Sequence, residues 1–301
     1  MSKPSYGSLL LSLLNNLLFF KTRLLFRKTT NEHKLFNHYR NIFSIISNID
    51  TLSLTKPCIL VEKYFRSVGY LKEYYDLEEA EYISIHGVLR KALAEEVNIL
   101  RIQGASSIYS RMLFLLASLN YLVLFKPELA RYSLQLNNIL SMPVPPQADE
   151  AKILDLLKPG EEITFIPGNI YSAWALEILI KDLISQGYRV KLLVCNEEFE
   201  LNINKNNVLR YWRQIIDKEG VELVFINCYK GLLSTNSSVV VVLNNLLIFH
   251  ILDKIGELTD HDNAILVFNP MYTVLQEILG STPIVISISS LRNILFRRYN
   301  M

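Results

Sequence analysis

The sequence predicts an α/β protein, with a largely parallel, doubly wound sheet in its C-terminal half and a mainly helical domain before it. Two patterns in the 301 residues favour this fold class. Beyond residue 160, short apolar runs rich in β-branched residues alternate with helical stretches, which is typical of strands that helices cover on both faces. Before residue 142, apolar residues recur three and four positions apart, which indicates amphipathic helices.

Prolines mark the predicted domain boundary. The stretch Met142-Pro-Val-Pro-Pro146 excludes a helix, because proline lacks the backbone N–H and restricts the residue before it. A second turn, Lys158-Pro-Gly160, stands just before the first expected strand. We therefore predict a helical domain at residues 1–141, a Pro-rich connector at 142–160 and an α/β domain at 161–301.

The elements follow from these patterns in chain order. The N-terminal half is expected to hold helices at Asn31–Asn48, Tyr64–Ala92 and Ser106–Leu124. Six strands are expected after the connector, at Ile163–Ile166, Arg189–Cys195, Val221–Asn227, Val239–Leu243, Ala264–Phe268 and Ile284–Ile288. The helices expected between them are Ala173–Gln186, Val208–Lys218 and Leu246–Leu258. Gly187 and Gly220 follow the first two of these helices, as glycine commonly does at a helix end.

Charge and cysteine usage bound the class of protein. A net charge of +2 gives no overall reason to expect nucleic acid. Basic residues nevertheless gather near both ends, and Arg292, Arg297 and Arg298 are candidates for DNA phosphate contact, with solvated side chains as the alternative. Three widely spaced cysteines, Cys58, Cys195 and Cys228, are expected to be buried free thiols in a reducing compartment, which predicts a cytoplasmic protein.

Leu9–Phe20 is the segment that invites a membrane interpretation. It is shorter than the roughly 20 apolar residues that a spanning helix needs, and two asparagines interrupt it. No small-residue cleavage site follows it, so a secretory signal is not expected. We expect this helix to pack on its own protein, with peripheral membrane contact or partner docking through residues 8–28 as the alternatives.

The expected strands end in amides rather than acids. Ligands of open α/β sheets bind at the carboxyl ends of the strands, where this chain has Asn169, Asn244 and Asn269. Only Glu197 and Glu198, after the second strand, are acidic. No aspartate is placed to hold Mg²⁺ beside a nucleotide, so we expect no metal site.

The turn after the first strand looks like a phosphate loop without its working parts. Such a loop needs a second glycine, a lysine and a hydroxyl residue, and residues 168–175 have Ala173, Trp174 and Ala175 in these places. We expect a structural turn, with residual anion binding at the helix N-terminus as the alternative. The degenerate nucleotide-binding positions are Gly168, Asn169, Ser172, Glu197, Glu198 and Asn244.

From residue 151 onward the order of segments resembles the ATPase core of RecA-type recombinases, especially the archaeal RadA-like branch and its clock-protein relatives. Residues 153–168, ILDLLKPGEEITFIPG, look like the lead-in and phosphate-loop strand, and 190–199 look like the strand that ends in a catalytic glutamate. Residues 238–249 look like the metal-binding strand, with Asn244 in place of aspartate. The resemblance implies a RecA-like fold that has lost ATP hydrolysis, in which Glu197 or Glu198 keeps the place of the catalytic glutamate.

The sequence thus predicts a non-catalytic RecA-like protein that uses no cofactor and acts by binding. Its expected partner is a protein, such as an active RecA-like ATPase of recombination or DNA repair, with DNA as a further candidate. Two alternatives stay open. One is a Rossmann-like enzyme such as a nucleotide-sugar transferase, which would hold a diphosphate at the Gly168 turn. The other is a membrane-peripheral scaffold that uses residues 8–28.

Overall fold

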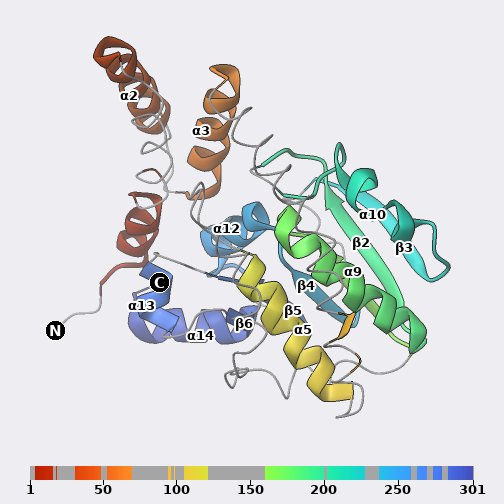
Figure 1. Cartoon of the computed structure of the whole chain (residues 1–301). Coiled ribbons are helices and arrows are strands. Elements are labelled where there is room, and N and C mark those ends of the chain that lie inside the picture. Colours follow the sequence, from red (N-terminus) through yellow and green to blue (C-terminus); the bar gives the residue numbers. More distant parts are fainter. Residues whose placement is uncertain are drawn as a thin grey trace.

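The structure is a computed structural model that describes residues 4–15, 18, 31–48, 53–69, 94–95, 98, 105–120, 160–199, 202–227, 237–258, 263–269, 274–279 and 284–300. A central sheet has helices on both of its faces (Figure 1). Helices of the N-terminal half lie against the same sheet or project from it (Figure 1).

The sheet has six strands in the order β3-β2-β1-β4-β5-β6. They are β1 (Glu162–Ile166), β2 (Arg189–Cys195), β3 (Val221–Ile226), β4 (Val239–Val242), β5 (Ala264–Phe268) and β6 (Ile284–Ser287). The pairs among β1 to β5 are parallel, whereas β6 runs antiparallel to β5. Each predicted strand is present within one or two residues, so the predicted α/β class with a largely parallel sheet is confirmed. The strand order is that of the dinucleotide-binding, or Rossmann, arrangement.

Most of the helices begin within three residues of their predicted positions, whereas the helices at Val274–Leu279 and Ile288–Arg298 were not predicted. They are α2 (Glu32–Ser47), α3 (Thr55–Ser67), α5 (Ala105–Leu119), α9 (Ile170–Ser185), α10 (Val208–Ile216), α12 (Asn245–Lys254), α13 (Val274–Leu279) and α14 (Ile288–Arg298), with a first helix at residues 6–15. The helix predicted at Tyr64–Ala92 differs from α3, which begins nine residues earlier, at Thr55, and already ends at Ser67. Residues 70–92 of the prediction lie outside the described residues.

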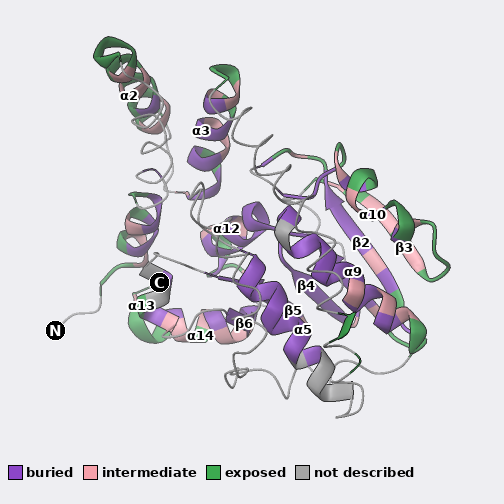
Figure 2. Cartoon of the chain, in the orientation of Figure 1, coloured by how far each residue is buried: buried purple, intermediate pink, exposed green. Residues whose placement is uncertain are grey.

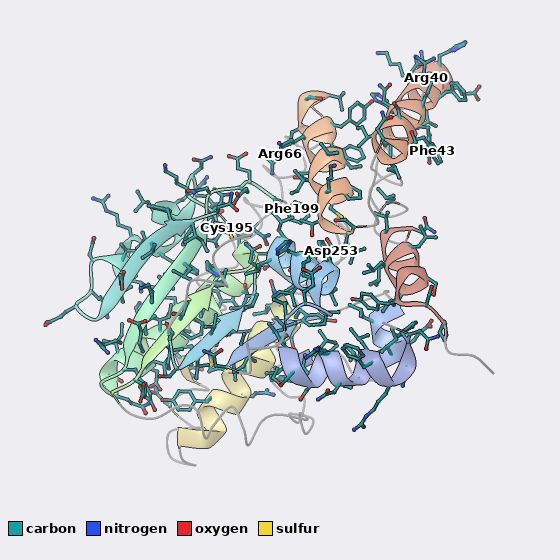
Figure 3. All side chains as sticks on the ribbon, turned by 180° about the vertical axis from the view of Figure 1, so that it is seen from behind. Arg40, Phe43, Arg66, Cys195, Phe199 and Asp253 are labelled. Carbon is teal, nitrogen blue, oxygen red and sulfur yellow. The ribbon has the colours of Figure 1, made fainter. Side chains whose placement is uncertain are left out.

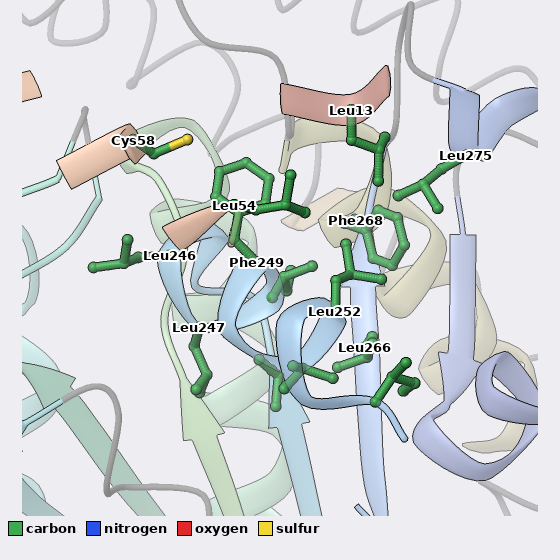
Figure 4. Close-up of a cluster of buried hydrophobic side chains, with 14 of the residues drawn as sticks. Leu13, Leu54, Cys58, Leu246, Leu247, Phe249, Leu252, Leu266, Phe268 and Leu275 are labelled. Atoms are coloured by element: carbon green, nitrogen blue, oxygen red, sulfur yellow. The ribbon is translucent and has the colours of Figure 1, made fainter. Parts of the chain in front are cut away.

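Alternate side chains of each strand enter two different hydrophobic cores. In β1, Phe165 packs with α5, α9 and α10 on one face, whereas the neighbouring Ile166 packs with α12, α14, α3 and the first helix on the other. The buried colouring of Figure 2 covers most of β1, β2, β4, β5 and β6 and the helix sides that face them, whereas the edge strand β3 is only partly buried. Figure 4 shows the core that contains Ile166, where Leu13 and Leu54 lie near Phe249 and Phe268. The result is a three-layer sandwich of helices, sheet and helices.

Segments from the N-terminal half help to build both cores. In α5, Met112 and Leu116 belong to one core, while Leu9 and Leu13 of the first helix belong to the other. Each core therefore contains residues from both sides of the predicted domain boundary. Residues 142–159 lie outside the described residues, so the boundary itself stays a prediction.

Most leucines of the first helix face the protein, whereas Leu11 is 50% exposed. Leu9, Leu10, Leu13, Leu14 and Leu18 are buried in the core shared with α12. These side chains are therefore not available to a membrane or a partner, and the rest of the predicted 8–28 contact segment falls largely outside the described residues. Within the described parts of the chain, no helix combines the length and apolarity needed to cross a bilayer.

The cysteines differ from the prediction at one position. Cys58 is a buried thiol, as expected. Cys195, at the end of β2, is disulfide-bonded, which corrects the expectation of a free thiol there. Cys228 lies outside the described residues.

Asp253 joins the N-terminal helices to the sheet. The residue before α3, Leu54, has no side chain that caps the helix. Asp253 on α12 supplies this cap, because its carboxylate accepts hydrogen bonds from the backbone N–H groups of Leu54 (2.6 Å) and Thr55 (3.0 Å). The hydroxyls of Ser53 and Thr55 donate to the same carboxylate. A negative charge at this position also complements the helix dipole of α3.

Candidate functional site

The strand order places the expected ligand crevice between β1 and β4. The chain winds from β1 toward β2 and β3 on one side and continues from β4 to β6 on the other. In open α/β sheets, ligands bind beside the carboxyl ends of the strands where the order reverses. The turn after β1 and the residues after β4 and β5 therefore define the candidate site.

The turn after β1 starts α9 with a conventional cap. The Asn169 side chain accepts a hydrogen bond from the Ser172 N–H at 3.1 Å, and the Ser172 hydroxyl donates to the Asn169 carbonyl at 2.9 Å. Asn169 Nδ2 donates to the carbonyl of Leu119, the last residue of α5. Both predicted positions, Asn169 and Ser172, are buried and hydrogen-bonded within the protein.

The crevice itself is filled by Asn120, which directly follows α5. Its side chain is fully buried, and Nδ2 donates to two carbonyls, Leu243 O at 2.6 Å after β4 and Val267 O at 2.9 Å in β5. Its Oδ1 accepts a hydrogen bond from the Asn169 N–H at 3.4 Å, at the start of α9. The Asn120 backbone carbonyl accepts from the Asn269 N–H at 2.8 Å. One residue thus occupies the place between the ends of β1, β4 and β5 where a ligand would lie.

Gly168 is required by this close packing. A Cβ atom at position 168 would lie 2.5 Å from the Leu243 carbonyl oxygen and closer still to Asn120 Oδ1. Real Cβ atoms essentially never approach another heavy atom so closely, so only glycine fits. Gly168, the first glycine of the phosphate-loop-like turn, therefore allows the turn to pack closely against the side chain of Asn120.

The side chain of Asn244, after β4, also hydrogen-bonds to other residues of the protein. Asn244 is the N-cap of α12, where its side chain accepts from the Leu247 N–H at 3.1 Å. Its Nδ2 donates to the Pro167 carbonyl at 3.3 Å, which links the start of α12 to the turn after β1. Asn244, which stands where the resemblance would place a metal-binding aspartate, therefore forms hydrogen bonds that stabilise the fold.

Two buried amides at this edge have polar atoms without partners. Within the described residues, neither Asn202 Nδ2 nor Asn202 Oδ1 has a hydrogen-bond partner, and neither does Asn269 Oδ1. Asn202 lies beside the turn, since it forms a β-bridge with Asn169. Such amides can donate and accept hydrogen bonds, but they supply neither an acid–base group nor a nucleophile.

Glu198, after β2, contacts residues outside the group of amides around Asn120. Glu198 is exposed and meets Arg66 of α3 at 3.4 Å, while its other oxygen accepts from Asn206 Nδ2 at 2.5 Å. Arg66 also pairs with the buried Glu62 at 3.0 Å, so a polar chain runs from α3 to the loop after β2. Glu197 is partly buried in the same loop.

The candidate DNA-contacting arginines all belong to α14, which follows the edge strand β6. Arg292 is partly buried and its guanidinium lies 5.0 Å from the Phe296 ring centre. Arg298 donates to the Glu277 carbonyl of α13 at 3.4 Å, and Arg297 is exposed in the last turn. Cations in a last helical turn complement the helix dipole. These arginines do not join the amide cluster around Asn120.

Asn120 is the important residue that the sequence analysis did not single out. Asn120 falls inside a helix predicted over Ser106–Leu124, and only the structure shows that α5 ends at Leu119, directly before this amide. Within the described residues, no group of three or more His, Cys, Asp or Glu side chains is arranged to hold a metal ion. Burial lowers the pKa of His250, which lies on α12.

The fold has a counterpart among solved structures. It is similar to that of a DUF89 family protein from Pyrococcus horikoshii, with a TM-score of 0.60 and 11% sequence identity. The match covers 95% of this chain and 99% of that protein. No model of a protein family and no curated protein sequence matches the chain. At this identity the likeness concerns the fold alone.

Proposed function

We propose that this chain is a non-catalytic protein that acts by binding another macromolecule, and that its ligand crevice is kept for its shape. The observation that carries the proposal is the filled crevice. Asn120 hydrogen-bonds to both sides of the switch point and contacts the turn where phosphates of a bound nucleotide would lie.

The contacts of Asn120 oppose anion binding at the start of α9. A phosphate at a helix N-terminus needs backbone N–H groups that point at it. Here the Asn169 N–H faces Asn120 Oδ1, and the Ser172 N–H donates to the Asn169 side chain. An incoming phosphate would have to displace a fully buried amide and leave two carbonyls without a donor, which costs about 1–3 kcal/mol for each buried group.

Thermal unfolding with Mg²⁺-ATP tests the proposal directly. A ligand held at about 100 times its Kd adds about 2.7 kcal/mol to the free energy of unfolding. We expect the unfolding midpoint of this protein to stay unchanged in millimolar Mg²⁺-ATP, because the crevice is filled. A saturable rise of the midpoint, or Mg²⁺-dependent ATP hydrolysis that is lost in Asn244→Ala, would contradict the proposal.

The identity of the partner belongs to the same proposal. The segment order that resembles RecA-type recombinases suggests an active ATPase of that class, and affinity purification from the native host tests it. Recovery of such an ATPase in stoichiometric amount would support a RecA-type partner, whereas its absence from the recovered proteins would contradict that assignment. The cytoplasmic location stays a prediction, and the Cys195 disulfide counts against it, because cytosolic disulfides are rare outside hyperthermophiles.

A Rossmann-like enzyme is the second candidate, and the strand order favours it. The order β3-β2-β1-β4-β5-β6 is that of the dinucleotide-binding arrangement. The same unfolding measurement with NAD and with nucleotide sugars separates the two candidates. Stabilisation by one of these compounds, and not by ATP, would favour the enzyme, and would require Asn120 to leave the crevice.

A further inference from the structure

Helix α2 carries the two most exposed large hydrophobic side chains among the described residues. Phe36 is 67% exposed and Phe43 is 66% exposed. They stand seven residues apart, which places them two helical turns apart on one side of α2. Arg40 lies between them and is exposed too, and Tyr39 stacks on Phe43 with ring centres 6.5 Å apart. Single exposed apolar residues are ordinary, but an aligned pair of phenylalanines flanking a cation is not.

The opposite side of α2 is attached to the protein. Ile42 is buried in the core, and Leu35, Ile45 and Ile46 pack against that core. The hydroxyl of Tyr64 on α3 lies 2.5 Å from His38 Nδ1 and accepts from Asn41 Nδ2 at 3.2 Å. These contacts fix which side of α2 faces outward. Figure 3 shows Arg40 and Phe43 on the part of α2 that projects from the body of the protein.

In the sequence, the N-terminal segment that contains α2 has a net charge opposite in sign to that of the remaining chain. Residues 1–47 hold seven Lys and Arg residues and one acid, Glu32, which makes a net charge of +6. The whole chain carries +2, so residues 48–301 carry −4. Within the basic segment, Leu and Phe residues alternate with the cations, as in the sequence 21–28, KTRLLFRK. Mixed cations and large apolar residues are typical of segments that lie in the interface of an anionic bilayer.

We propose that α2 docks this protein on an anionic phospholipid surface through Phe36, Arg40 and Phe43, which we call the aromatic–basic face. The phenyl rings would enter the boundary between headgroups and acyl chains, and Arg40 would meet lipid phosphates. Electrostatic attraction to anionic lipid and burial of apolar area both strengthen such binding.

The shape of this region favours a bilayer over a nucleic acid. Single-stranded nucleic acids are held in positively charged grooves where bases stack on aromatic rings. The aromatic–basic face instead belongs to a helix that projects from the body of the protein (Figure 1) and that carries Arg40 and Phe43 on its projecting part (Figure 3), so it presents a convex edge to a flat surface. The proposal also places the membrane contact on α2 and not on the first helix, where Leu9, Leu10, Leu13 and Leu14 are buried in the core and Leu11 is the exposed leucine.

Vesicle flotation with the full-length chain tests the proposal. The probes are vesicles of phosphatidylcholine alone and vesicles that also contain phosphatidylserine. We expect binding to the phosphatidylserine vesicles that weakens when salt is raised, because the Debye length falls from about 10 Å at 0.1 M to about 3 Å at 1 M. The double variant Phe36→Ala/Phe43→Ala should bind about tenfold more weakly, since two rings no longer enter the interface. Arg40→Gln should bind about fivefold more weakly to the anionic vesicles.

The matched control is Leu209→Ala on α10, which removes a side chain that is 59% exposed elsewhere on the protein. Its vesicle binding should equal that of the unaltered chain. Thermal unfolding of all variants shows whether each is folded, and their midpoints should agree because all the changed side chains are exposed. Equal binding to both vesicle types, no binding to either, or the same loss in Leu209→Ala would overturn the proposal. Binding of an oligonucleotide that depends on Phe36 and Phe43, without vesicle binding, would assign the face to nucleic acid instead.

Discussion

The side chain of Asn120 fills the crevice and hydrogen-bonds to the backbone on both sides of it. Its side chain makes two donor contacts and one acceptor contact, each to the backbone at a different strand end or helix start. Its backbone carbonyl adds a fourth contact, from the Asn269 N–H. Because the residue is fully buried, water does not compete for these hydrogen bonds. Loss of one of them leaves a buried polar group unsatisfied, which lowers the free energy of unfolding by the full desolvation penalty of that group.

Replacement of Asn120 tests this account at the residue scale. Asn120→Ala leaves the Leu243 and Val267 carbonyls without their donor, so we expect the free energy of unfolding to fall by about 3 kcal/mol in a urea titration. Asn120→Asp keeps the shape but cannot donate to either carbonyl and adds a buried charge, so it should cost at least as much. Asn37→Ala, at an exposed position of α2, is the control and should change stability by less than about 0.5 kcal/mol. A change in Asn120→Ala no larger than in this control would contradict the account.

Single residues were only partly predictable from the sequence. The asparagines after β1 and β4 were identified as replacements for ligand-binding groups, and the structure shows them as helix caps. The pattern could not show that Asn120 meets them, because this contact depends on how α5 packs across the sheet. Glu198 likewise looked like part of a nucleotide site, and its pairing with Arg66 depends on where α3 lies.

At the scale of elements, Asp253 anchors α3 from another part of the chain. Four hydrogen bonds from residues 53–55 converge on its carboxylate, and the side chain is nearly two hundred positions away in sequence. Side-chain caps normally come from the residue before the helix, but here Leu54 occupies that position. The docking of α3, and of α2 upon it, therefore depends on a contact without a local sequence signal.

Removal of this cap should loosen α3. Asp253→Asn keeps the shape of the side chain but removes its charge and one acceptor oxygen, so we expect a loss of about 2 kcal/mol of unfolding free energy. Hydrogen exchange should rise first in the amides of α3 and leave those of β1 and β4 protected. Glu257→Gln, a nearby exposed carboxylate that pairs with Lys254, is the control and should change stability little. Uniformly faster exchange across the sheet would show that Asp253 supports the whole fold instead of α3.

The strands were the most predictable elements, and the start of α3 was the least. Strands buried on both faces form continuous apolar runs, so β2 and β5 were placed at their observed limits. The prediction began α3 at Tyr64, although the helix starts at Thr55 with Pro57 in its first turn. Proline is tolerated there because the first N–H groups of a helix have no partner within it. Pro57 is therefore compatible with a helix that begins at Thr55.

The whole molecule depends on packing across the predicted domain boundary. Helix α5 covers one face of the sheet, and the first helix and α3 contribute to the core on the other face. The sequence pattern indicated that these segments are amphipathic helices, but periodicity does not tell which surface a helix covers. The division at 142–160 came from proline content, which marks a break in secondary structure and does not report a break in the core.

A fragment of residues 160–301 tests how far the sheet can fold by itself. Without α5 and the N-terminal helices, the apolar side chains of both cores would be exposed to water. We expect the fragment to lack a cooperative thermal transition and to bind a dye that reports exposed apolar surface, whereas the full chain unfolds cooperatively. Addition of residues 1–159 as a separate chain should restore part of the transition. A cooperative transition in the fragment alone would support two independent domains.

The tight fit of Gly168 against Asn120 also constrains how related chains can diverge. Any larger residue at position 168 would collide with Asn120 Oδ1 and with the Leu243 backbone carbonyl, and the second collision remains whatever residue stands at position 120, so position 168 must stay glycine while position 120 can change. The residue at position 120 therefore serves to sort homologues that keep Gly168. A chain that retains both residues inherits a closed crevice. A chain that has replaced Asn120 by a smaller residue and Asn244 by an acid has gained both the space and the charge from which a new enzyme can evolve.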